Sequence, residues 1–114
     1  QQIAIVKLAG EFCHRVFNSG TYYNNFFVDF NIGQTPAQVL TTTTQKTVLM
    51  NEFIARFWGF NVQPVEVEVN ARNEMNTLID DLLVGENMNS STTTRKIAKG
   101  VCTAMLSSAP VTMF

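Results

Sequence analysis

Residues 49–60 read Leu49-Met50-Asn51-Glu52-Phe53-Ile54-Ala55-Arg56-Phe57-Trp58-Gly59-Phe60, and they form the most regular apolar pattern of the chain. Large apolar side chains recur as a pair every four residues, which places them along one stripe of an α-helix. Glu52 and Arg56 stand four residues apart on the polar face, where an acid and a base can meet. Gly59 occupies a position typical of a helix end. We therefore expect the other elements to cover this helix, since burying six such side chains contributes on the order of 10 kcal/mol before conformational entropy is subtracted.

The composition indicates a single domain, residues 1–114, with a surface that is poor in charge. Charged residues make up 15% of the chain, the net charge is −1 and the pI is about 5.7. Thr and Asn, 13 and 11 residues, supply the polarity instead. Neutral hydrogen-bonding groups are easier to bury against another subunit than Lys or Glu. This composition favours a component of a larger assembly. The net charge gives no electrostatic field that would attract the chain to nucleic acid or to an anionic membrane.

Four helices and two or three strands are expected. Helical periodicity covers residues 3–17, the stretch that follows Asn70 and ends at Gly85, and the stretch from Ser91 or Thr92 to Pro110. Alternation with period two predicts strands over residues 22–32 and 61–70. Residues 37–44 are open to two interpretations, a hairpin strand or the start of a helix after Pro36, and the four consecutive Thr favour the strand.

These elements predict one α+β domain in the order α-β-β-α-β-α-α, with a short sheet covered by about four helices. If residues 37–44 are helical, the two remaining strands can pair in parallel through a right-handed crossover.

No apolar run approaches the roughly 20 residues of a membrane-spanning helix. The chain starts with Gln, which suggests a processed protein or a portion of a longer product. The predicted core is Leu49, Phe53, Phe57, Leu78, Ile79, Leu82, Phe12 and Val65.

The sequence assigns no catalytic, cofactor-binding or metal site. His14 is the only histidine, and its neighbour Cys13 points about 100° away on a helix, so the two do not form a nucleophile–base couple. An acidic group lacks the spacing of a calcium loop and is interpreted as a solvated helix face; it consists of Glu74, Asp80, Asp81 and Glu86. Asn89-Ser90-Ser91 matches a glycosylation sequon, which matters only in a secretory setting.

The two cysteines, Cys13 and Cys102, lie on or beside the apolar stripes of the first and last helices. Terminal helices of small domains are often close together. Neither a signal sequence nor a Cys-rich framework argues for oxidation, so two buried, unbridged thiols are predicted. The compartment of the protein is left open.

The resulting functional hypothesis is a non-enzymatic structural or interaction subunit of a larger assembly, such as a virion or a secretion or pilus-like machine. Its partners are other protein subunits, of the same or a different chain. The predicted interface residues are Tyr23, Phe27, Trp58, Phe60, Val111, Met113 and Phe114. The alternative is a small module that binds single-stranded nucleic acid or a small ligand, with Arg95, Lys96 and Lys99 as its weakly indicated basic residues.

Overall fold

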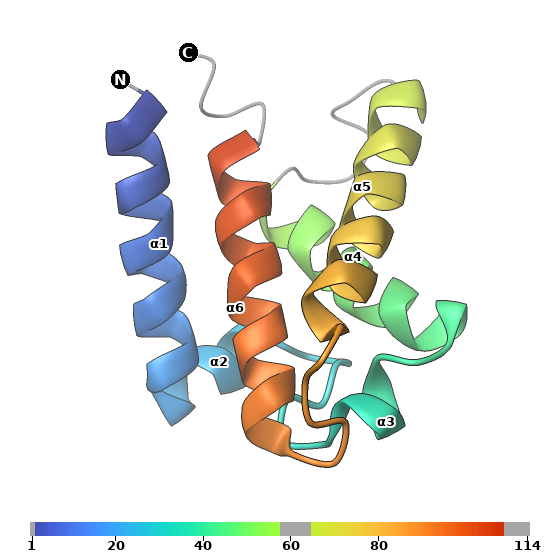
Figure 1. Ribbon diagram of the computed structural model, residues 1–114. Helices are drawn as coiled ribbons and strands as arrows, with labels where there is room; N and C mark the ends of the chain where they lie inside the picture. Colours follow the sequence, from blue (N-terminus) through green and yellow to red (C-terminus); the bar gives the residue numbers. More distant parts are fainter. Residues whose placement is uncertain (1, 58–64, 109–114) are drawn as a thin grey trace.

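The computed structural model describes residues 2–57 and 65–108, without the side chains of residues 2–6, 26, 57, 65–68 and 108. These residues form six α-helices and no β-strand (Figure 1). The helices are α1 (Gln2–Asn18), α2 (Gly20–Phe26), α3 (Pro36–Val39), α4 (Thr43–Phe57), α5 (Val65–Leu83) and α6 (Ser91–Ser108). The expected α+β fold with a small sheet is therefore wrong, and the described part of the chain is all-helical.

Helix α6 is the central element of the bundle. It contacts α1, α3, α4 and α5, and its most extensive contact is with α1 (Figure 1). Helices α1 and α5 lie on opposite sides of α6, and α4 passes behind α5 with its last turns next to α6 (Figure 1). The last element of the sequence thus organises the packing. No helix in residues 2–57 and 65–108 has both the length and the apolar character needed to cross a membrane.

The strand predicted over residues 22–32 is instead a short helix followed by an irregular segment. The first turns belong to α2, where backbone N–H groups of Tyr23 and Phe27 donate to the carbonyls of Ser19 and Tyr23 at 3.1 and 2.8 Å. Residues 27–35 then run without regular structure, and Phe27, Phe30 and Ile32 turn into the core. Aromatic side chains suit a strand, but here they fill space between helices, and this tertiary packing overrides the local preference.

The threonine-rich stretch over residues 37–44 is a junction between two helices and contains no strand. Thr42 caps α4 reciprocally: its hydroxyl accepts the Gln45 N–H at 3.1 Å, and Gln45 Oε1 accepts the Thr42 N–H at 3.0 Å. Thr35 and Gln38 form a second capping box at the start of α3. Both follow the Thr-x-x-Gln pattern, in which the two residues satisfy N–H groups that a helix start leaves unpaired.

The strand predicted over residues 61–70 is also wrong in its described part, because α5 begins at Val65. Asn70, predicted as a cap, lies inside this helix. Residues 61–64 lie outside the described residues. Gly85 follows the end of α5 with a φ of 78°, as expected of a left-handed residue after a helix. The first and last predicted helices correspond to α1 and α6.

The core is built around an aromatic group at the meeting point of α1, α4 and residues 27–30. The ring of Phe27 lies 5.3 Å from Phe17, 5.7 Å from Phe30 and 5.9 Å from Phe53, measured between ring centroids. The Phe27–Phe53 pair is edge-to-face, an arrangement favoured by the quadrupoles of the rings. This group joins three segments that are distant in the sequence.

The predicted core is confirmed at its centre and wrong at one position. Leu49, Phe53 and Ile79 are fully buried, and Leu78 and Leu82 are partly buried against them. Phe12 is exposed, because α1 turns the face with Ala9, Cys13, Val16 and Phe17 inward. The side chains of Phe57 and Val65 lie outside the described residues.

The prediction of two unbridged thiols is wrong, because Cys13 and Cys102 form a disulfide between α1 and α6. Their Cα atoms are 6.0 Å apart, and both side chains are fully buried. The prediction correctly placed both cysteines inside, close to the contact of the terminal helices. It relied on the compartment expected for the protein and on the low cysteine count, neither of which reports the distance between two particular residues.

We expect Phe53→Ala to lower the free energy of unfolding by about 3–5 kcal/mol, since it deletes a ring that packs on Phe27 and leaves a cavity. Urea denaturation measures the change. Asn51→Ala, on the exposed side of the same helix, is the matched control and should change stability by less than about 0.5 kcal/mol. A loss below about 1 kcal/mol for Phe53→Ala would show that α4 is peripheral to the core.

We expect no free thiol when the unreduced protein is titrated in denaturant, because its only two cysteines are bonded to each other. Replacing both by Ala should lower stability by about 2–4 kcal/mol, as the unfolded chain then gains conformational freedom. Two reactive thiols in the unreduced protein would contradict the bridge. The single Cys13→Ala variant serves as a control, since it must expose one thiol.

Candidate functional site

A pocket of about 430 Å³ opens where α1, α2 and the end of α4 meet. Two arginines, two aromatic rings, an amide and an aliphatic side chain line it: Phe12, Arg15, Val16, Tyr22, Asn25 and Arg56. No charge in this lining is negative. The pocket lining thus combines apolar and aromatic side chains with the positive charge of two guanidinium groups.

The arginines of this pocket come from different helices that the fold brings together. Arg15 stands in the last turn of α1, and Arg56 stands in the last turn of α4. Arg56 Nη2 donates to the carbonyl oxygen of Asn25 at 3.4 Å, which ties its guanidinium to α2. Planar guanidinium groups bind carboxylates through two parallel hydrogen bonds, and they also stack on rings. An anionic group next to an apolar one is the ligand chemistry that fits here.

The pocket belongs to a larger surface on α1 and α2, which we call the α1–α2 flank and define by Leu8, Phe12, Arg15 and Tyr22. Its three apolar or aromatic members are 69%, 45% and 58% exposed. Leu8 and Phe12 are four residues apart, so they are neighbours on the helix. Rings and arginines at an exposed surface are the residue types that dominate protein interfaces.

A second surface lies on the outward side of α5, which we call the α5 flank and define by Val69, Glu74, Asp81 and Val84. All four side chains are exposed, with Val84 just beyond the helix end. Asp80 lies beside them and accepts a hydrogen bond from the buried Lys46 at 2.9 Å, which ties α5 to α4. Of the four acids expected on a solvated helix face, only Glu74 and Asp81 are exposed on α5 without a described ion pair, since Asp80 is paired with Lys46 and Glu86 follows the helix and is paired with Lys96.

Glu52 shapes the segment that follows α2. The sequence places it on the polar face of α4, yet the structure buries it, and Oε1 accepts the backbone N–H groups of Val28 and Asp29 at 3.1 and 2.7 Å. A buried carboxylate needs such donors, and an irregular segment needs acceptors for its N–H groups. Glu52 therefore holds residues 27–29 against α4.

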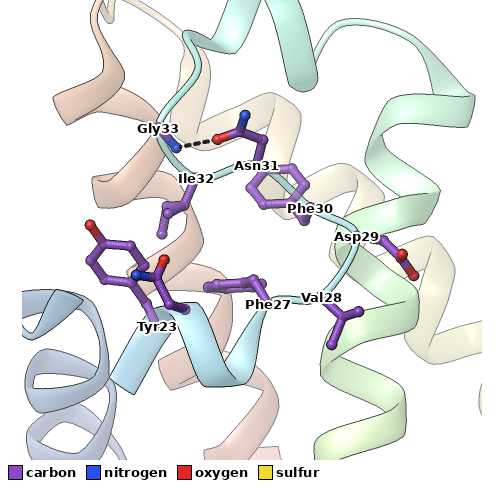
Figure 2. Close-up of a pocket in the computed structure, with 9 residues that line it drawn as sticks. Tyr23, Phe27, Val28, Asp29, Phe30, Asn31, Ile32 and Gly33 are labelled. Carbon is purple, nitrogen blue, oxygen red and sulfur yellow. Dashed lines mark hydrogen bonds between the residues drawn. The ribbon is translucent and has the colours of Figure 1, made fainter. Parts of the chain in front are cut away.

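A second pocket, of about 480 Å³, lies along this irregular segment (Figure 2). Tyr23, Phe27 and Ile32 turn toward one another, whereas Val28 and Asp29 point away from them (Figure 2). Asn31 Oδ1 accepts the backbone N–H of Gly33 at 2.9 Å and so stabilises the turn. The one carboxylate among the lining residues thus points away from the three apolar side chains, and the pocket gathers no set of reactive groups.

Of the seven predicted interface residues, the structure describes two, Phe27 and Tyr23. Phe27 is buried in the core, so its predicted exposure is wrong; alternation assigns faces only to a strand, and this segment is not one. Tyr23 is partly exposed and carries the guanidinium of Arg95 over its ring, 5.4 Å from the centroid. Five further predicted positions lie outside the described residues: Trp58, Phe60, Val111, Met113 and Phe114.

The basic residues proposed for nucleic-acid binding do not form a common patch. Lys96 Nζ donates to the Glu86 carboxylate at 3.2 Å, and Arg95 lies over Tyr23. Lys99 Nζ lies 2.5 Å from His14 Nδ1, on the side of α6 that faces α1. The three cations lie within five positions of one helix, but each contacts a different element.

Cys13 and His14 do not form a nucleophile–base pair, since Cys13 is bonded to Cys102 and has no thiol to activate. Asn18 Nδ2 lies 2.7 Å from His14 Nε2, so both ring nitrogens have neighbours. Among the described residues, no three His, Cys, Asp or Glu side chains converge in a way that would hold a metal ion.

No family model matches the chain, and no curated protein or solved structure is significantly similar to it.

Removing the Glu52 carboxylate should loosen the segment after α2. We expect Glu52→Ala to speed hydrogen exchange at the Val28 and Asp29 amides at least tenfold and to lower the unfolding free energy by about 2 kcal/mol. Glu52→Gln keeps an amide oxygen as acceptor and should lose less. Unchanged exchange at both amides in Glu52→Ala would show that these hydrogen bonds do not hold the segment.

Proposed function

We propose that this chain is a non-enzymatic structural subunit that assembles with copies of itself. The α1–α2 flank of one copy binds the α5 flank of the next. The observation that carries this proposal is the placement of the exposed apolar side chains. Among the large ones in the described residues, three lie on the α1–α2 flank and two on the α5 flank, and only Val28 lies elsewhere. Single exposed apolar residues are ordinary on protein surfaces, whereas groups of them mark interaction sites. Leu8 and Phe12 are neighbours on α1, whereas Val69 and Val84 stand near opposite ends of α5, about 22 Å apart at 1.5 Å per residue, so a partner would have to extend along that helix.

The charges of the two surfaces are opposite. Arg15 on the α1–α2 flank and Arg56 in the adjoining pocket are cationic, whereas Glu74 and Asp81 on the α5 flank are anionic. Opposite charges around apolar contacts set the register of an interface and disfavour wrong partners. With a net charge of −1, the chain has no overall repulsion between copies to overcome.

The helices that carry most of the two surfaces, α1 and α5, lie on opposite sides of α6 (Figure 1). A contact between different surfaces of identical chains is head-to-tail, and it produces either closed rings or open filaments. A standard interface of about 800 Å² per partner would occupy roughly an eighth of the accessible surface of 6829 Å² at each end. Repeating assemblies of this kind are the basis of virions, secretion machines and pili, which agrees with the low charge and the Thr- and Asn-rich composition.

Charge reversal tests the proposal by sedimentation velocity over a range of concentrations. Arg15→Glu and Asp81→Arg should each weaken self-association at least tenfold, because each places like charges across the contact. A mixture of the two variants should associate again, since the acidic α1–α2 flank of one then meets the basic α5 flank of the other. The control combines Gln34→Glu with Ala37→Glu, two exposed sites elsewhere, which change the net charge as much as Arg15→Glu does.

Two outcomes would overturn the proposal. One is a monomer at concentrations up to about 1 mM, where an association of only about −4 kcal/mol is already visible. The other is association that both single variants leave unchanged. A stable monomer that binds a single-stranded oligonucleotide with steep salt dependence would instead support the nucleic-acid alternative.

A further inference from the structure

We propose that Asn89 carries an N-linked glycan and that the protein folds in the secretory pathway. This inference does not rest on the proposed assembly. Asn89-Ser90-Ser91 is a glycosylation sequon, in which the hydroxyl group two residues after the asparagine is required for recognition. Such a triplet arises by chance in many proteins, so its meaning depends on where it lies and in which compartment the chain folds.

The structure places the sequon on the surface. Asn89 is exposed in the segment between α5 and α6, and Ser91 is exposed as the first residue of α6. The backbone N–H of Asn89 donates to Asn87 Oδ1 at 2.9 Å, so the segment has a defined turn. The Ser90 carbonyl accepts the Thr93 N–H at 3.1 Å at the start of the helix. A bulky, hydrophilic glycan at Asn89 can therefore extend into solvent without displacing a packed side chain.

The disulfide gives an independent indication of the compartment. Cys13 and Cys102 are fully buried and bonded to each other, although 89 positions separate them in the sequence. Structural disulfides of this kind form and persist in oxidising compartments and are rare in a reducing cytosol. The oxidising lumen of the secretory pathway is also where sequons receive glycans. A buried disulfide and an exposed sequon in one small chain thus point to the same route.

The modification forms one bond and breaks one. The Asn89 Nδ2 nitrogen bonds to the anomeric carbon of an oligosaccharide that is carried on a lipid diphosphate. The lipid diphosphate leaves, and the amide nitrogen loses one proton. Nothing is oxidised or reduced in this step, and the Ser91 hydroxyl acts in recognition of the acceptor asparagine.

The test is secretion of the full chain from eukaryotic cells behind a cleavable leader, followed by intact mass measurement before and after treatment with peptide N-glycosidase. We expect a glycan mass that the enzyme removes, with Asn89 converted to Asp. Asn89→Gln and Ser91→Ala should each abolish the mass shift, whereas Ser91→Thr should keep it. Asn73→Gln is the matched control, because it changes an exposed asparagine on α5 that is outside the sequon and outside the turn that holds it.

Titration of free thiols on the same material verifies that the secreted protein is folded and bridged. Secreted protein with no free thiol and no glycan mass would overturn the proposal. A glycan that persists in Asn89→Gln would also overturn it, since the sugar would then be attached elsewhere.

Discussion

The covalent closure of the chain at Cys13 and Cys102 is the constraint on which the other contacts depend. It fixes α1 against α6, and α6 in turn contacts α3, α4 and α5. With these helices in place, the space between α1 and α4 is filled by residues 27–32, whose rings pack on Phe17 and Phe53. Glu52 then satisfies the backbone N–H groups of that irregular segment from the side of α4. The aromatic packing and the Glu52 hydrogen bonds thus both depend on the pairing of α1 with α6.

Two polar groups connect the core to the surface in this small bundle. Lys46 is buried on α4, and its ammonium reaches Asp80 on α5. Glu52 is buried on the same helix and binds backbone N–H groups. Buried charges are tolerated only where partners satisfy them, and removing one partner is costly. These contacts fix α4 against α5 on one side and against residues 27–29 on the other.

The sequence predicted the long helices better than the segments between them. Apolar stripes with helical period correctly identified α1, most of α4 and α6, because a face of many residues is buried in each. Val and Thr gave misleading evidence over residues 37–44 and 65–70, where local preferences of a few tenths of a kcal/mol per residue yield to packing. The two Thr-x-x-Gln capping boxes were the available signal for the starts of α3 and α4. The arginine pocket had no such signal, since Arg15 and Arg56 meet only through the fold.

A bridge between residues 13 and 102 also has a topological consequence. Residues 13–102 lie within one covalent ring, so a single cut by a protease at the segment between α5 and α6 opens the backbone without releasing a fragment. Exposed polar segments of this kind are where nicking concentrates. The cleaved protein would persist as two chains held by one sulfur–sulfur bond and by their shared core, and they would separate only on reduction and unfolding.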